Sequence, residues 1–139
     1  MHYFFLLYIY MNKYSNGYIY GIKCNTTNLL YIGSSIEPMK TRLTKHITDL
    51  KGYLGINPRP RAYRSSFEVL MNDNYEMKKV CDYPCENKHQ LEVREGLFIK
   101  HNNTCNKRLP CKLTNKDLIE GNFSLKNWEY NKVKKSKCR

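Results

Sequence analysis

Two short runs of aromatic and β-branched residues, separated by a polar loop, constrain the fold of this chain more than any other feature. Residues 18–24 read YIYGIKC, residues 29–34 read LLYIGS, and the loop 25–28 (NTTN) lies between them. Two such runs joined by a four-residue polar loop are typical of a β-hairpin. The sequence therefore predicts an antiparallel pair of strands near the start of the chain.

The loop also predicts which residues of the hairpin face one another. Counting back from both ends of the loop places Tyr20 opposite Gly33. Tyr31 then lies on the same face of the sheet as Tyr20, as a diagonal neighbour. Because glycine has no side chain, Gly33 would leave space beside the Tyr20 hydroxyl.

The segment after the hairpin has the periodicity of a helix. Pro38 suits the first turn, and apolar residues recur at helical spacing up to about Gly52. Arg42 and His46 are four residues apart in this segment. They are therefore expected to lie one above the other on a single face of the helix.

The second half of the chain contains three further predicted elements. Residues 52–60 are rich in Gly and Pro and indicate a loop, followed by a short helix over 62–71. Residues 75–83 indicate a strand, and residues 86–102 a helix with Glu95 on an otherwise apolar stripe. The element order predicts an α/β (α+β) fold, in which helices flank a small, three-stranded, mainly antiparallel sheet.

One domain is expected, because 139 residues can form a single core but not two. We assign residues 17–110 to this domain, residues 1–16 to an apolar leader or an extra strand, and residues 111–139 to a basic C-terminal extension. The apolar stretch 3–10 is far shorter than the about 20 residues of a membrane span. It also lacks the features of a secretory signal. We therefore expect an intracellular protein, cytoplasmic or nuclear, that is neither secreted nor inserted in a membrane.

The charge of the chain indicates a polyanionic partner. There are 24 Lys and Arg against 12 Asp and Glu, a net charge of +12, and 41% of the residues are hydrophobic, as in a folded domain. Nucleic acid is the commonest such partner, and an acidic membrane surface is the alternative. Arg59, Arg61 and Arg64 form a cluster that is a candidate for contacts with the DNA backbone. A solvated loop is an equally good interpretation of this cluster.

Residues 18–20 (YIY) and 31–33 (YIG), with ten residues between them, resemble the paired motif that names the GIY-YIG endonuclease family. Tyr18 replaces the first glycine of that motif, whereas Tyr20 supplies the tyrosine that the pattern requires. The family's pattern continues with an arginine, a histidine four residues later, a glutamate in a late helix and a closing asparagine. The matching residues are Arg42, His46, Glu95 and Asn106. The resemblance covers roughly residues 17–108.

This resemblance implies a metal-dependent endonuclease that hydrolyses DNA phosphodiester bonds. Glu95 would hold one Mg²⁺ or Mn²⁺, and Arg42 would clamp the phosphate. Tyr20 would take a proton from water, while Tyr31 and His46 would complete the hydrogen-bond set. His46 is expected to change charge near neutral pH. Among members of the family, we favour the homing or mobile-element type over repair and restriction enzymes.

Each of these residues also has an alternative, structural interpretation. A strand tyrosine usually packs in a core, a single helical histidine or arginine is usually a surface residue, and Glu95 could pair with a neighbouring cation. Glu92 is the nearest competitor of Glu95 as metal ligand. The alternative function is a non-catalytic nucleic-acid-binding domain that retains the nuclease fold. The joint order and spacing of the five residues favour the nuclease.

Overall fold

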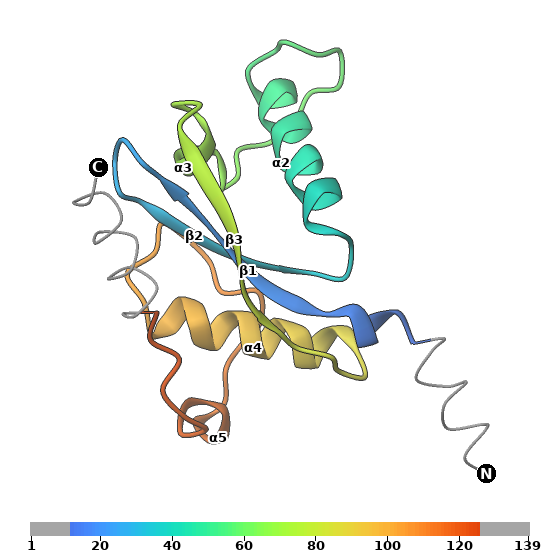
Figure 1. Ribbon diagram of the computed structural model, residues 1–139, viewed down its shortest axis with the longest axis vertical. Helices are drawn as coiled ribbons and strands as arrows, with labels where there is room; N and C mark the ends of the chain where they lie inside the picture. Colours follow the sequence, from blue (N-terminus) through green and yellow to red (C-terminus); the bar gives the residue numbers. More distant parts are fainter. Residues whose placement is uncertain (1–11, 126–139) are drawn as a thin grey trace.

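A three-stranded antiparallel sheet with helices on both faces forms the centre of the protein (Figure 1). The computed structural model describes residues 12–125, so residues 1–11 of the predicted segment 1–16 and residues 126–139 of the predicted extension 111–139 lie outside the described residues. The elements in chain order are η1 (Lys13–Asn16), β1 (Tyr18–Cys24), β2 (Leu30–Ser35), α2 (Met39–Tyr53), α3 (Phe67–Leu70), β3 (Tyr75–Asp82), α4 (Lys88–Lys100) and α5 (Asn115–Leu118).

The sheet has the strand order β2-β1-β3, and both pairings are antiparallel. This confirms the predicted α+β class with its three-stranded sheet. The hairpin register is also confirmed, since Tyr20 pairs with Gly33 and Ile22 with Tyr31. β1 is the central strand, and all seven of its residues are buried. A run so rich in aromatic and β-branched residues suits this position, because both of its faces are covered.

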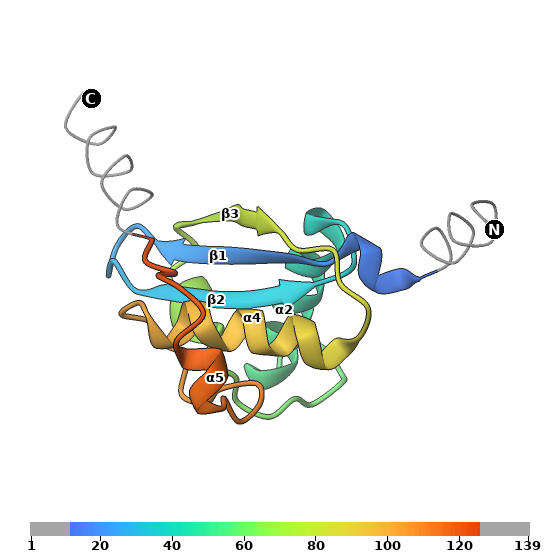
Figure 2. The ribbon, with the colours of Figure 1, turned by 90° about the horizontal axis from the view of Figure 1, so that it is seen from below.

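Each face of the sheet carries its own hydrophobic core (Figures 1 and 2). On one face, residues of β1 pack with α2 and α3, and this core contains Tyr18, Tyr20, Ile22, Cys24, Leu50, Phe67, Val69 and Leu70. On the other face, α4 packs chiefly against β2. That core contains Ile19, Leu30, Ile32, Leu91, Phe98, Ile99 and Leu125. The alternation along β1 and β2 therefore sends Tyr18, Tyr20 and Tyr31 to the α2 face, and Ile19, Leu30 and Ile32 to the α4 face.

The two long helices lie close to where the sequence predicts them. α2 begins one residue after Pro38, whose carbonyl accepts a hydrogen bond from the Arg42 backbone N–H at 3.0 Å. α4 is capped by Asn87, whose side chain accepts a hydrogen bond from the Gln90 backbone N–H at 2.9 Å. The apolar stripe predicted for α4 is buried against the sheet.

The helix predicted over 62–71 is wrong in its first half. Helical structure is confined to α3, and the chain from 62 to 66 is irregular. The side chains of this stretch have partners elsewhere: Arg61 and Arg64 face Asp49, and Ser66 faces His46. These tertiary contacts outweigh the local helical preference, which is weak for so short a segment.

The outer edge of β2 is closed by a later segment of the chain. Both backbone polar groups of Ile32 pair with the Asn106 side chain, at 3.0 Å from the N–H and 2.8 Å to the carbonyl. The Cys105 backbone N–H donates to the Leu30 carbonyl at 2.8 Å. The Asn106 side chain therefore forms the two hydrogen bonds that a neighbouring strand would form with Ile32, so these backbone groups of the edge strand are not left unpaired.

Part of the region assigned to the C-terminal extension packs against α4. Asn102 accepts a hydrogen bond from the Leu125 backbone N–H and donates to the Phe123 carbonyl, at 2.8 and 2.9 Å. Arg94 lies between the Tyr83 and Phe123 rings, 4.4 and 4.8 Å from their centroids. The short helix α5 was not expected from the polar sequence around it. No helix within residues 12–125 is long and apolar enough to cross a bilayer.

Leu125 gives a direct test of whether this segment belongs to the folded core. Because its side chain is buried with that of Ile99, Leu125→Ala should lower the free energy of unfolding by about 2–4 kcal/mol in urea denaturation. Ile119, with 83% of its surface exposed, is the matched control. Ile119→Ala should change stability by less than about 0.5 kcal/mol. Equal effects of the two changes would contradict the packing described here.

Candidate active site

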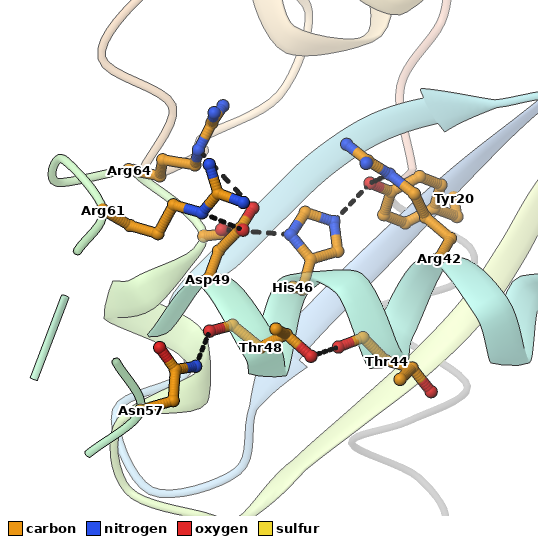
Figure 3. A network of polar contacts seen from close by, with 10 residues as sticks. Tyr20, Arg42, Thr44, His46, Thr48, Asp49, Asn57, Arg61 and Arg64 are labelled. Carbon is orange, nitrogen blue, oxygen red and sulfur yellow. Dashed lines mark hydrogen bonds and ion pairs between the residues drawn. The ribbon is translucent and has the colours of Figure 1, made fainter. Parts of the chain in front are cut away.

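Tyr20 is the buried centre of a group of polar side chains on the α2 face of the sheet. Its side chain is fully buried, and its hydroxyl lies 2.6 Å from His46 Nε2. Arg42 Nε donates a hydrogen bond to the same hydroxyl oxygen at 3.1 Å. Figure 3 shows Arg42 and His46 reaching Tyr20 from the same face of α2. The predicted relation of these two helical residues is therefore borne out by the geometry.

His46 continues this chain of contacts away from the tyrosine. Its Nδ1 lies 3.2 Å from the hydroxyl oxygen of Ser66, whose side chain is buried at the start of α3. Burial, together with the positive charges of Arg42 and Arg64, lowers the pKa of His46 to about 3. The expectation that His46 changes charge near neutral pH is therefore wrong for the free protein. A neutral imidazole has one N–H, so one ring nitrogen donates and the other accepts.

Tyr31 packs beside this pair, as the register predicted. Its ring centroid lies 6.4 Å from that of Tyr20 and 5.6 Å from that of His46. Burial and the negative charge of Glu95 raise the pKa of Tyr31 to about 12, and burial raises that of Tyr20 further still. Both phenols are therefore protonated in the free protein at neutral pH.

Gly33 lies directly under the end of the Tyr20 side chain. A Cβ atom at this position would overlap the Tyr20 hydroxyl oxygen and the ring carbon that carries it. The space predicted beside the hydroxyl therefore exists, and it depends on the absence of a side chain. Glycine is required at position 33 because the Tyr20 side chain approaches the backbone closely, and not because of the backbone conformation.

Glu95 approaches the same region from the opposite face of the sheet. It lies on α4, and its Oε1 accepts a hydrogen bond from the Ser34 hydroxyl at 2.7 Å. Ser34 belongs to the edge strand β2, and the Glu95 carboxylate is near enough to the tyrosines of the other face for its charge to raise their pKa values. Burial raises the pKa of Glu95 to about 7, although the Ser34 hydrogen bond and the charge of Arg42 act in the other direction. No ion pair of Glu95 occurs among the described residues.

These properties fit a divalent cation held by Glu95. A partly buried carboxylate without an ion-pair partner is costly, and a bound cation would offset that cost. Within residues 12–125 no group of three His, Cys, Asp or Glu side chains could form a metal cage. A single carboxylate nevertheless suits Mg²⁺, which keeps several of its waters. Glu92 fits the role less well, because it pairs with Lys88 at 3.6 Å.

Tyr18, which replaces the first glycine of the motif, has a structural role. Its side chain is buried, and its hydroxyl donates to the Glu37 carbonyl at 2.6 Å, just before α2 begins. Its ring centroid lies 6.0 Å from that of Tyr20. Tyr18, the residue that departs from the family's pattern, therefore joins β1 to the start of the helix that carries Arg42.

The predicted arginine cluster lies at the other end of α2. Arg61 and Arg64 both pair with Asp49, at 3.3 and 3.7 Å. Arg59 is exposed, and its backbone N–H donates to Asn57 Oδ1 at 3.1 Å. Figure 3 shows Arg61 and Arg64 gathered at Asp49, farther along α2 than His46.

Three further residues take part in the site although sequence analysis did not single them out. Ser34 holds Glu95, Ser66 contacts His46, and Asp49 holds two arginines. Asp49 is three residues after His46, so helical spacing could have indicated it. The hairpin register places Ser34 near the motif. No signal in the sequence points to Ser66, because its contact depends on how the chain returns after the loop.

Comparison with known proteins agrees with this geometry. A family model described as the GIY-YIG catalytic domain matches residues 16–109, more than half of the chain. The chain belongs to the GIY-YIG family, whose domain is a nuclease domain that acts on DNA and generally uses divalent metals. Neither a curated protein nor a solved structure matches the chain.

Gly33→Ala should displace the Tyr20 hydroxyl without changing any polar group of the site. Because a displacement of about 1 Å can cost about 10²-fold in rate, the nicking rate of plasmid DNA should fall by about that factor. Ile119→Ala is the control, since the Ile119 side chain is 83% exposed and lies outside the site. Wild-type cleavage by Gly33→Ala would contradict the close contact.

Glu95→Gln should stabilise the metal-free protein at alkaline pH. The pKa of Glu95 in the fold is about 7, above the ordinary 4.5, so the folded state binds this proton more tightly than the unfolded chain. Stability contributed by the protonated group is therefore present below pH 4.5 and is lost as pH rises through 7. At pH 8 in EDTA the variant should gain up to about 3 kcal/mol, and at pH 4.5 the difference should nearly vanish.

Urea denaturation at the two pH values measures this difference. Glu92→Gln, which removes the same charge from a neighbouring position on α4, should show a much smaller gain, because the charge of Glu92 raises the pKa of Glu95 less than burial does. Adding Mg²⁺ at pH 8 should raise the melting temperature of wild type but not that of Glu95→Gln. A gain that is the same at both pH values would exclude titration of Glu95 as its cause.

Proposed function

We propose that this protein is a metal-dependent endonuclease of the homing or mobile-element type, which hydrolyses phosphodiester bonds in DNA. The observation that carries the proposal is the contact of Arg42 and His46 with Tyr20, together with a carboxylate, Glu95, whose charge acts on the tyrosines and which has no ion pair within residues 12–125. Hydrolysis of a phosphodiester requires an activated water, positive charge beside the phosphate and support for the leaving oxygen. The proposed site contains a group for each requirement.

Glu95 would hold one Mg²⁺ or Mn²⁺. When bound, the ion would act as a Lewis acid on the phosphate and support the leaving 3′ oxygen. The protein's own contribution is the Ser34 hydroxyl, which fixes one carboxylate oxygen at 2.7 Å. Because the pKa of Glu95 is about 7, the cation would compete with a proton at this carboxylate. Binding of the metal should therefore weaken as pH falls below 7.

Arg42 would bind the phosphate and offset the charge that develops on it. Its Nε donates a hydrogen bond to the Tyr20 hydroxyl at 3.1 Å. The two terminal NH₂ groups would donate to phosphate oxygens. One guanidinium can thus position both the tyrosine and the substrate. Lysine has no second donor in a fixed geometry, so Arg42→Lys should be a poor replacement.

Tyr20 would take a proton from the attacking water and pass its own proton to His46. The 2.6 Å contact between the Tyr20 hydroxyl and His46 Nε2 allows this transfer if the single imidazole N–H is on Nδ1, facing Ser66. His46 is a weak base in the free protein because Arg42 and Arg64 lie near it. Phosphates of bound DNA would neutralise these cations and raise the pKa of His46. Substrate binding would therefore make His46 a stronger base, able to accept the proton in this relay from water through Tyr20 to His46.

Tyr31 would restrict the motion of the two rings of this relay. It packs edge-on against His46, with an interplanar angle of 80°. Arg59, Arg61 and Arg64 would contact phosphates of the DNA backbone beyond the cut, where they supply affinity without sequence specificity.

Cleavage of supercoiled plasmid tests the proposal. Wild type should nick DNA with Mg²⁺ or Mn²⁺ and not in EDTA, whereas Glu95→Ala and Arg42→Ala should each lose at least about 10²-fold in rate. Glu92→Ala is the control, because its side chain pairs with Lys88, and it should cut at nearly the wild-type rate.

Two other results would lead to different conclusions. If wild type binds plasmid without ever cutting it, and Glu95→Ala binds equally well, the domain is a non-catalytic nucleic-acid-binding module. Mapping the nicks tests the homing assignment, which predicts a few discrete sites. Nicks scattered over the whole plasmid would contradict that assignment but leave the nuclease proposal intact.

A further inference from the structure

A row of functional side chains on α2 continues beyond the tyrosine cluster. Arg42, His46 and Asp49 follow one another at spacings of four and three residues, so they lie on one face of the helix. Figure 3 shows Arg42 and His46 at Tyr20, and Asp49 directed to the following loop. At 1.5 Å per residue, Asp49 lies roughly 10 Å along the helix from Arg42.

Asp49 contacts two arginines of that loop at once. Arg61 Nε lies 3.3 Å from Oδ1 and Arg64 Nε lies 3.7 Å from Oδ2. The Asp49 side chain is 24% exposed, whereas those of Arg61 and Arg64 are 44% and 62% exposed. The carboxylate therefore lies beneath two guanidinium groups that remain accessible from solvent.

The loop is attached to α2 by more than these ion pairs. Asn57 Nδ2 donates to the Thr48 carbonyl at 3.0 Å, and the Ile56 backbone N–H donates to the Lys51 carbonyl at 2.8 Å. Gly52 lets the Arg59 backbone approach so closely that a Cβ at position 52 would overlap its carbonyl oxygen. These contacts fix the backbone that carries the arginines before any ligand arrives.

The ion pairs contribute little stability by themselves, because exposed pairs are worth about 0–1 kcal/mol. Their effect is on orientation, since one carboxylate holds two like-charged groups side by side. Ser66, two residues after Arg64, also contacts His46 at 3.2 Å. The arrangement of the loop is thus joined directly to the catalytic helix.

We propose that Asp49 is a positioning residue that holds Arg61 and Arg64 as a preformed clamp for a second backbone phosphate of the DNA. This inference rests on the proposed function. Because Asp49 lies roughly 10 Å along the helix from Arg42, the clamped phosphate would lie close to the scissile one on the DNA backbone. The clamp would align the strand so that the scissile phosphate meets Arg42 and Tyr20.

The salt dependence of DNA binding in EDTA tests the clamp without any need for cleavage. Each phosphate contact contributes about 0.9 to the slope of log K against log salt concentration. Arg61→Ala/Arg64→Ala should therefore lower the slope for a fluorescent duplex by about 2. Lys112→Ala/Lys116→Ala, which removes two exposed charges near α5 on the opposite side of the sheet, should lower it by less than 1. Equal slopes for the two double variants would overturn the clamp.

Asp49→Asn tests positioning, because it removes the charge but keeps the shape. DNA binding should stay within about threefold of wild type or become tighter, since a negative charge is lost, whereas kcat on saturating plasmid should fall about tenfold. In the Arg61→Ala/Arg64→Ala background, Asp49→Asn should have no further effect on kcat. A persistent effect there, or an unchanged kcat in Asp49→Asn alone, would overturn the positioning role.

An activity-free measurement separates this inference from the proposed nuclease. The NMR order parameters of the Arg61 and Arg64 Nε–H groups should be higher in wild type than in Asp49→Asn, because the Asp49 carboxylate restricts both side chains. If the order parameters fall in Asp49→Asn while wild type never cuts plasmid, the nuclease proposal fails and the positioning by Asp49 stands. If the order parameters do not depend on Asp49, the clamp fails whether or not the protein cuts DNA.

Discussion

The contact between the Tyr20 hydroxyl and His46, 2.6 Å apart in a buried region, is the interaction on which the rest of the site depends. A buried hydroxyl or imidazole without a partner costs about 1–3 kcal/mol, so the two groups fix α2 against β1 in one position. That position in turn brings Arg42 to Tyr20 and Asp49 to the arginine loop. Gly33 makes the contact possible by leaving the hydroxyl its space.

The site is divided between the two faces of the sheet, beside the edge strand β2. Glu95 belongs to the α4 layer and the tyrosines to the α2 layer, yet its charge raises the pKa of Tyr31. The pKa of Glu95 itself is raised to about 7, first by burial. An edge strand is well suited to this arrangement, because side chains from both layers can meet around it while Asn106 pairs with its outer backbone groups. The charged form of the carboxylate is therefore destabilising, a common property of active sites.

Much of this arrangement could be predicted from the sequence, because its determinants are local. The four-residue loop set the register that places Tyr20 opposite Gly33, and helical spacing placed Arg42 and His46 together. The failures have tertiary causes. Residues 62–66 are irregular because their side chains contact α2, and His46 does not titrate near neutral pH because it is buried beside two arginines. Neither burial nor the return of the chain to Ser66 can be inferred from spacing.

The pH titration of the His46 ring nitrogens by NMR tests the central claim most directly. The ring should remain neutral from pH 8 to pH 4.5, with its proton on Nδ1 and with Nε2 accepting from the Tyr20 hydroxyl. Tyr20→Phe should change the chemical shift of Nε2 and leave that of Nδ1 nearly unaffected. A pKa near the ordinary 6.5 for His46, or a proton on Nε2 in the free protein, would contradict the buried relay from Tyr20 to His46.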